Sequence, residues 1–166
     1  MVAGSIPAEG ASTSKERQNI RNQILPDNPR EYLGYGFVRL LTLAFLSVVV
    51  VRSAIHVFTP DGGAQSIAGI DISVSGGNNI IALFHQWGAI QLLLAGLMLT
   101  LFFAYKGFTP LVILFLALDA PMRALAGMML EIESSHTPPG EALNWPAFFI
   151  LAILFIVSLR QKNAKP

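Results

Sequence analysis

The sequence predicts an all-α integral membrane protein built as a four-helix bundle. Of its 166 residues, 53% are hydrophobic and only 13% are charged, and the mean hydropathy is +0.57. A soluble domain carries about 25% charged residues, so the low charge indicates a membrane protein. The apolar residues gather in four segments separated by polar connections, which predicts four transmembrane helices. The absence of cysteine excludes disulfides and cysteine-ligated metal sites.

A polar segment, residues 1–31, precedes the first apolar stretch. It is rich in Ser, Gly, Asn and charged residues, a composition typical of disordered chain. It lacks the short apolar stretch and small-residue cleavage site of a signal peptide. We therefore expect a disordered cytoplasmic tail, followed by a first apolar segment that stays in the membrane as an anchor.

The four apolar segments differ in length. Crossing a bilayer takes about 20 residues in a helix, and the fourth segment is the shortest. We expect Arg160 and Lys162 to extend it by placing their charged ends at the membrane surface. The bundle is expected to occupy residues 32–162, with spans at about 35–57, 80–104, 108–130 and 145–160 and outer loops at 59–79 and 131–144.

The connections alternate in charge. The loops at 59–79 and 131–144 contain acids but no Lys or Arg. Basic residues instead precede the first span, occupy the short turn at Lys106 and follow the fourth span. Positive residues favour the cytoplasmic side of a membrane. This pattern predicts a multi-pass protein of the cell (inner) membrane with both termini in the cytoplasm and both acidic loops outside.

The first outer loop, 59–79, is longer than a simple connector requires. The glycine pairs Gly62-Gly63 and Gly76-Gly77 flank an apolar stretch at residues 67–74. Two interpretations are open: two short extended pieces that lie over the mouth of the bundle, or a flexible loop.

The third predicted span contains two charged residues, Asp119 and Arg123. They are four positions apart and therefore lie on one face of the helix. A charge inside a bilayer costs roughly 3 kcal/mol even on insertion scales, so the presence of this pair in a membrane span indicates a structural or functional role. Pro121 lies between them and is expected to kink the helix, because it cannot donate a hydrogen bond to the carbonyl of Ala117. The pair is either a functional site or a structural ion pair.

Other polar side chains fall in the same outer half of the membrane when position along each helix is converted to depth. Two arginines then face one aspartate, and an unpaired buried arginine favours a second anion. A loop acid such as Asp61, Asp71 or Glu131 could supply it, and so could a lipid phosphate or a ligand carboxylate. The sequence thus predicts an outward-facing pocket for an anionic amphiphile. No metal site is expected, because no helix carries two metal ligands at a suitable spacing. The candidate ligand-binding residues are Asp119, Arg123, His85, Gln86, Arg52 and His56.

Each rim residue of this pocket also has a plainer interpretation. Arg52 and His56 can extend to the outer headgroups, and His85 with Gln86 can form an interhelical hydrogen bond. A stripe of small residues on the third span predicts close packing against the second span. The stripe is Ala117, Ala120, Ala124 and Gly127, and its expected counterparts are Gly88, Ala95 and Gly96.

Three motifs surround the last three spans. They are GIDISVSGGNN before the second span, HQWGAIQLLLAGLML within it, and RALAGMMLE followed by SSHTPPGEALNW before the fourth. In these, over about residues 69–160, the chain resembles the DoxX-like superfamily of small four-helix membrane proteins, in a bacterial branch. An Arg-containing stretch and a Pro-containing loop of that family correspond to Arg123 and Pro138-Pro139. Those relatives often carry an Arg where this chain has His85-Gln86. The resemblance implies a fold more than a reaction, although relatives include quinone-linked oxidoreductase subunits.

Three functions remain open at this point. Because no nucleophile–base pair is visible, we first expect an accessory or structural subunit that docks on a membrane protein or on a second copy of the chain. The alternative is binding or transport of a small amphiphile, such as a lipid or quinone, in the outward-facing pocket. The second alternative is a membrane-embedded enzyme that transfers protons through Asp119 and His85. The lipid bilayer is the expected surrounding; no cofactor is expected, and no basic tract indicates nucleic acid.

Overall fold

The computed structural model describes residues 22–162, and within that range it is helical with no strand. The all-α class is thereby confirmed, and three helices are long and apolar enough to cross a membrane, which is consistent with the predicted membrane protein. They are α2 (Gly36–Phe58), α3 (Gly77–Ala104), and the continuous stretch of the 3-10 turn η1 (Lys106–Phe108) and α4 (Thr109–Met129). Two shorter helices follow, α5 (Pro139–Ala142) and α6 (Asn144–Ser158). Residues 1–21, where most of the predicted disordered tail falls, lie outside the described residues.

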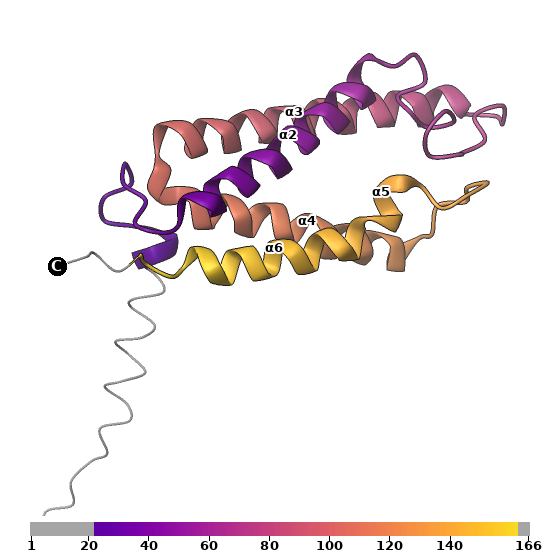
Figure 1. Ribbon diagram of the computed structural model, residues 1–166. Coiled ribbons are helices and arrows are strands. Elements are labelled where there is room, and N and C mark those ends of the chain that lie inside the picture. Colours follow the sequence, from indigo (N-terminus) through magenta and orange to yellow (C-terminus); the bar gives the residue numbers. More distant parts are fainter. Residues whose placement is uncertain (1–21, 163–166) are drawn as a thin grey trace, which may run out of the picture.

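Helices α2, α3, α4 and α6 pack as two antiparallel pairs (Figure 1). α2 lies along α3 and α4 lies along α6, with less extensive contact between the pairs. Residues 22–35, η1 and residues 159–162 lie at one end of the molecule, here called the terminal end. The loops at 59–76 and 130–143 lie at the opposite end, here called the loop end. The pairs approach each other at the terminal end and diverge toward the loop end.

This pairing differs from the predicted packing of the small residues of α4 against α3. Gly88 of α3 instead contacts α2, where a Cβ built on it would lie 2.6 Å from the Cβ of His56. Gly96 faces open space, with nothing within 4 Å of such a Cβ. Ala117 and Ala120 are buried, and α6 is the main partner of their helix. The short η1 turn joins α3 to α4 only at their ends, so it does not make them packing partners.

Arg39 of α2 joins the end of α3 to the start of α4 at the terminal end. Its guanidinium donates to the hydroxyl of Thr109 at 2.7 Å and to the carbonyl of Phe102 at 2.9 Å. The same group lies 4.1 Å from the centre of the Phe102 ring, in cation–π geometry. Carbonyls in the last turn of a helix lack partners within the helix, so Arg39 completes the end of α3 while holding α4 beside it.

The segment before α2 packs against η1. The N–H of Gly107 donates to the carbonyl of Pro29 at 2.8 Å. A Cβ on Gly107 would lie 2.8 Å from Cγ of Pro26 and 2.9 Å from the carbonyl oxygen of Glu31, so only glycine allows this approach. Part of the segment predicted as a polar tail is therefore ordered against the bundle.

The loop at 59–76 folds into consecutive turns. The described loop contains no strand, and it buries Ala64, Ala68 and Ile70. The Asp61 carboxylate organises it by accepting hydrogen bonds from the backbone N–H groups of Gly63, Gln65 and Ser66. The bond from the Ser66 N–H is the largest cause that lowers the pKa of Asp61 from 3.8 to about 2.

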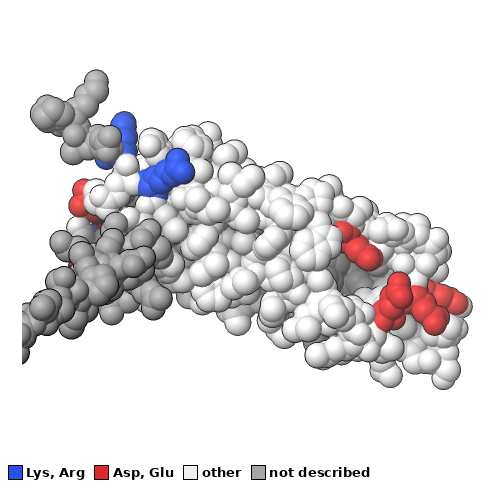
Figure 2. All heavy atoms as spheres, turned by 90° about the horizontal axis from the view of Figure 1, so that it is seen from below, with Lys and Arg blue, Asp and Glu red and all other residues white. Residues whose placement is uncertain are grey.

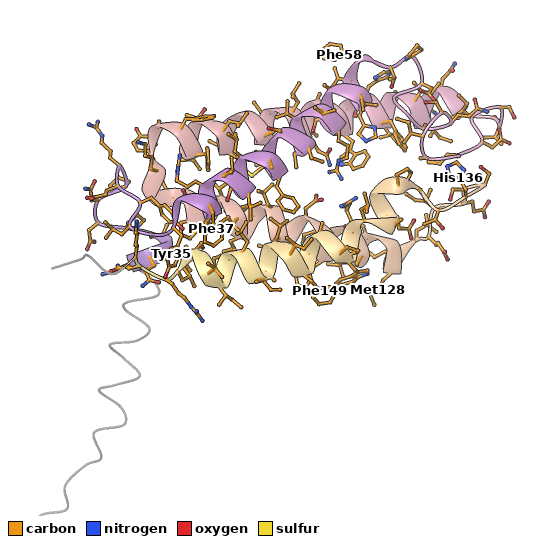
Figure 3. The ribbon with its side chains drawn as sticks, viewed as in Figure 1. Tyr35, Phe37, Phe58, Met128, His136 and Phe149 are labelled. Carbon is orange, nitrogen blue, oxygen red and sulfur yellow. The ribbon has the colours of Figure 1, made fainter. Side chains whose placement is uncertain are left out.

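The loops at 59–76 and 130–143 touch each other at the loop end. The N–H of Ser135 donates to the carbonyl of Gly69 at 2.9 Å, and Nε2 of His136 donates to the carbonyl of Ile67 at 3.2 Å. Gly69 has φ +69°, and a Cβ there would lie 2.6 Å from the His136 ring. His136 is labelled in Figure 3 beside both loops. These contacts link the two helix pairs where the helices themselves diverge.

Candidate functional site

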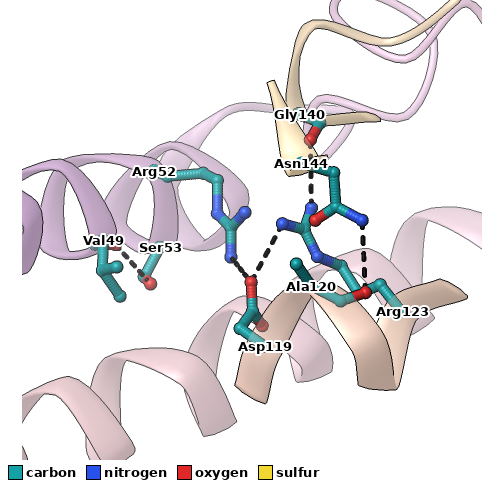
Figure 4. A network of polar contacts seen from close by, with 8 residues as sticks. All are labelled: Val49, Arg52, Ser53, Asp119, Ala120, Arg123, Gly140 and Asn144. Carbon is teal, nitrogen blue, oxygen red and sulfur yellow. Dashed lines mark hydrogen bonds and ion pairs between the residues drawn. The ribbon is translucent and has the colours of Figure 1, made fainter. Parts of the chain in front are cut away.

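The charged residues of α2 and α4 meet between the two helix pairs (Figure 4). Oδ2 of Asp119 lies 2.9 Å from Nη2 of Arg123, one turn further along α4. The same oxygen lies 3.6 Å from Nη2 of Arg52, which belongs to α2. One carboxylate oxygen is thus shared by two arginines. α4 runs as an unbroken helix through Pro121, so both of its charged side chains stay on the face toward α2.

Arg123 also reaches the segment that leads into α6. Its Nη1 donates to the carbonyl of Gly140 in α5 at 3.3 Å. Nearby, the Asn144 amide donates to the carbonyl of Ala120 at 3.2 Å. Asn144 is buried, and its Oδ1 has no hydrogen-bond partner among the described residues. These contacts hold the start of α6 against the charged turn of α4.

Arg52 is held from the other side by α3. In the orientation that satisfies both neighbours, the Gln91 amide oxygen accepts from Nη2 of Arg52 at 3.1 Å and from Nε1 of Trp87 at 2.9 Å. Cζ of Arg52 lies 5.8 Å from the centre of the Trp87 ring. The sequence did not mark Trp87 or Gln91 as site residues. The available signal was their spacing of four residues, which places them on one face of α3.

The cluster carries two positive charges against one negative charge. Its side chains are partly exposed, at 24% for Arg52, 29% for Arg123 and 42% for Asp119. The Nε atoms of both arginines are buried without a partner in the described part of the chain. An unsatisfied buried donor costs about 1–3 kcal/mol, and more when it belongs to a charged group. The arrangement therefore favours an additional anion.

The two predicted histidines do not join this cluster directly. Nδ1 of His85 donates to the carbonyls of His56 and Val57, at 2.9 and 3.1 Å. His85 thus forms an interhelical hydrogen bond, one of the two roles predicted for it, and completes the last turn of α2. Nδ1 of His56 donates to the carbonyl of Gly62 at 2.7 Å, and its buried ring lies 4.7 Å from that of Trp87.

Gln86 is exposed, and its side chain makes no hydrogen bond within the described residues. Of the six predicted site residues, the structure therefore gathers Arg52, Asp119 and Arg123. His56 reaches the cluster only by way of Trp87, and His85 is occupied by backbone carbonyls. Both histidines donate from Nδ1 to backbone carbonyls at the end of α2 or in the loop that follows it, and not to the charged cluster.

Within 22–162, no three His, Cys, Asp or Glu side chains come together as a metal site would require. Comparisons with protein-family models, with curated proteins and with solved structures give no match to this chain. The resemblance to the DoxX-like superfamily therefore stays a prediction.

Proposed function

We propose that the chain is a four-span protein of the cell (inner) membrane, with α6 as its fourth span. α6 has 15 residues, about 22 Å of helix, and is shorter than a typical span of about 30 Å. Its high apolar content and its packing along α4 support membrane placement. Figure 2 shows Lys and Arg at the terminal end and most of the visible Asp and Glu at the loop end. By the positive-inside rule, the terminal end faces the cytoplasm.

We further propose that the protein binds an amphiphile with an anionic head between the two helix pairs. The observation that carries this proposal is the unequal pairing of the arginines. Arg123 has an ion-pair partner in Asp119 at 2.9 Å and a hydrogen-bond acceptor in Gly140. Arg52 lies 3.6 Å from Asp119, beyond hydrogen-bonding distance, and Gln91 supplies only a neutral acceptor.

Arg52 is therefore the group that an added anion would neutralise. A guanidinium presents a fork of N–H donors that matches a phosphate or carboxylate. Its side chain remains partly exposed, so such a group has access to it. The head belongs to an amphiphile because Asp119 lies about 15 Å from either end of α4, and exposed apolar side chains such as Leu118 and Met122 flank it.

Native mass spectrometry from mild detergent tests this function with two substitutions, one that removes a positive charge from the cluster and one that removes its negative charge. Arg52→Gln leaves one arginine for one aspartate, and we expect the bound anionic amphiphile to be lost. Asp119→Asn leaves two arginines without a counter-charge, and we expect retention to rise. Arg30→Gln, an exposed charge at the terminal end, is the control. Equal retention in Arg52→Gln, Asp119→Asn and the unchanged protein contradicts the proposal.

An accessory subunit is the second candidate, and it is supported by the end of α4. Four apolar side chains in the last turn of α4 and just beyond it are strongly exposed, so no described part of the chain covers them. These residues are Met128, Met129, Leu130 and Ile132. In the same mass spectra, a stoichiometric protein partner would favour this role over amphiphile binding.

Proton transfer by Asp119 and His85 receives no support from the geometry. The contacts of Asp119 go to two arginines, and those of His85 go to the carbonyls of α2. No hydrogen bond joins the two groups in the described chain, so an enzymatic role is the least supported of the three.

A further inference from the structure

An apolar groove lies between α2 and α6, in the half of the molecule toward the terminal end. Its volume is about 220 Å³, and almost all of its lining is apolar. On α6 its residues extend over about 10 Å of helix. The lining residues are Phe37, Leu41, Ile150, Ile153, Leu154 and Val157.

The side chains of this groove suit a flexible hydrocarbon chain better than a partner helix. Helices associate in membranes through small residues, which let backbones approach, and through polar side chains that bond across the contact. The groove contains neither kind, since every lining residue is a large aliphatic or aromatic one. A narrow channel between such side chains accommodates an acyl chain, which adapts its shape to the surface.

Cationic residues follow the groove at its terminal end. Ile150, Ile153 and Val157 repeat at intervals of three and four along α6, which ends at Ser158. The backbone N–H of Arg160 donates to the carbonyl of Val157 at 3.0 Å, so Arg160 follows the last lining residue within one turn. The backbone N–H of Lys162 donates to the carbonyl of Leu33 at 2.9 Å, which keeps the chain after α6 beside the start of α2. Arg160 and Lys162 are both exposed.

From this juxtaposition we propose that the groove binds one acyl chain of an anionic phospholipid in the leaflet at the terminal end. The phosphate lies against Arg160 and Lys162, about one helical turn beyond the last apolar lining residue. The inference requires α6 to lie in the bilayer, as proposed above. It does not require the Arg52 site, because Leu41 and Arg52 are eleven residues apart on α2, about 16 Å along the helix.

The first experiment tests whether Arg160 and Lys162 bind the lipid headgroup. It uses the full chain in nanodiscs of phosphatidylglycerol and phosphatidylcholine, and the bound lipid is counted by native mass spectrometry. The unchanged protein should retain phosphatidylglycerol preferentially. The double substitution Arg160→Gln/Lys162→Gln should reduce that preference about tenfold, given the usual attraction of a surface cation for anionic lipid. The matched control is Arg30→Gln/Lys106→Gln, which removes two exposed charges at the η1 side of the same end.

The second experiment tests whether the groove binds the acyl chain, by filling the groove with a larger side chain. Ile153→Trp places a large side chain in it and should displace the bound lipid, whatever its headgroup. Ile156→Trp is the control, because Ile156 is similarly exposed on α6 but does not line the groove. The proposal is wrong if the double substitution keeps the lipid preference, or if both tryptophan variants retain equal lipid. It is also wrong if Ile153→Trp converts a dimer to a monomer, since a second copy would then occupy the groove.

A third comparison separates this inference from the proposed function. Lipid bound in the groove should persist in Arg52→Gln, and amphiphile bound at Arg52 should persist in Arg160→Gln/Lys162→Gln. Loss of both bound species in either variant would show that there is one site rather than two, and would overturn the groove as an independent site.

Discussion

Gly88 of α3 lies directly against His56 of α2, so closely that a Cβ on Gly88 would stand 2.6 Å from the Cβ of His56 and 3.0 Å from its carbonyl carbon. This is the closest approach at a glycine between the two helices. It sets Trp87 beside the His56 ring, and it brings Gln91, one turn further along α3, to Arg52. Helix packing thereby positions the α3 side of the candidate site.

Substituting Gly88 with Ala should destabilise the protein by about 1–3 kcal/mol, because the added methyl group overlaps α2 and forces the helices apart. The measurement is the free energy of unfolding in mixed detergent micelles. Gly96→Ala is the matched control on the same helix. Nothing lies within 4 Å of its added Cβ, so it should be neutral or stabilise by a few tenths of a kcal/mol. Equal effects of the two substitutions would contradict the close packing at Gly88.

The two ion pairs of Asp119 should differ in strength. A double-mutant cycle with Asp119→Asn and Arg123→Gln should give a coupling of about 1 kcal/mol, because the charged atoms of that ion pair lie only 2.9 Å apart. The cycle with Arg52→Gln should give only a few tenths, because 3.6 Å is too long for a hydrogen bond and solvent reaches the pair. An equal or larger coupling to Arg52 would mean that Arg52 is already neutralised, and would weaken the case for an added anion.

The Asp61 loop should lose stability in acid. The pKa of Asp61 is lowered in the folded protein from 3.8 to about 2, so the ionised carboxylate stabilises the fold above about pH 4. That stabilisation should disappear as the pH falls from about 4 to about 2. Its size should be about 1 kcal/mol, because solvent screens this exposed group.

Thermal unfolding of the unchanged protein and of Asp61→Asn between pH 2 and pH 5 measures this effect. The difference in melting temperature between the two proteins should become smaller as the pH decreases. Asp71→Asn is the control, since the Asp71 carboxylate accepts hydrogen bonds from Ser73 alone and should contribute less. A difference that stays constant across this range would show that Asp61 acts without regard to its charge.

Membrane orientation is testable because the chain contains no native cysteine. Single cysteines at Ser134, Lys106 and Gln161 occupy exposed positions at the loop end, at η1 and after α6. A membrane-impermeant maleimide should label Ser134→Cys in intact spheroplasts, and the other two only after permeabilisation. Labelling of both Ser134→Cys and Gln161→Cys from outside would show that α6 does not cross the membrane.

The positions of the helices could be predicted from the sequence, because a long apolar run predicts a membrane helix without any knowledge of which helices lie beside it. The start of α3 was harder to predict, since it begins at Gly77 rather than near Ile80. Gly76 and Gly77 suggested a loop, yet Gly77 lies inside the helix. It fits where a Cβ would overlap the carbonyl of Ile72, so glycine there serves close packing rather than flexibility.

The sequence predicted that Asp119, Arg123 and Arg52 would share a site, because two charges in an apolar span need partners at a similar depth. It did not predict Gln91 and Trp87, whose role depends on which helix lies beside α2. It also could not distinguish the histidines from the charged cluster, since depth along a helix says nothing about direction around it. His56 and His85 share the depth of the predicted site but bond to helix and loop ends.

The amino-acid order by itself therefore determined the helical class, the long apolar helices and the charges at mid-span, because these depend on composition and local periodicity. Only the tertiary structure decided that α3 pairs with α2 and α4 with α6, and hence that Arg52 is left 3.6 Å from an oxygen that Arg123 already holds at 2.9 Å. Helix pairing depends on contacts between distant segments, such as Gly88 with His56, which local sequence patterns do not encode. That inequality of the two arginines is the observation on which the proposed binding of an anionic ligand rests.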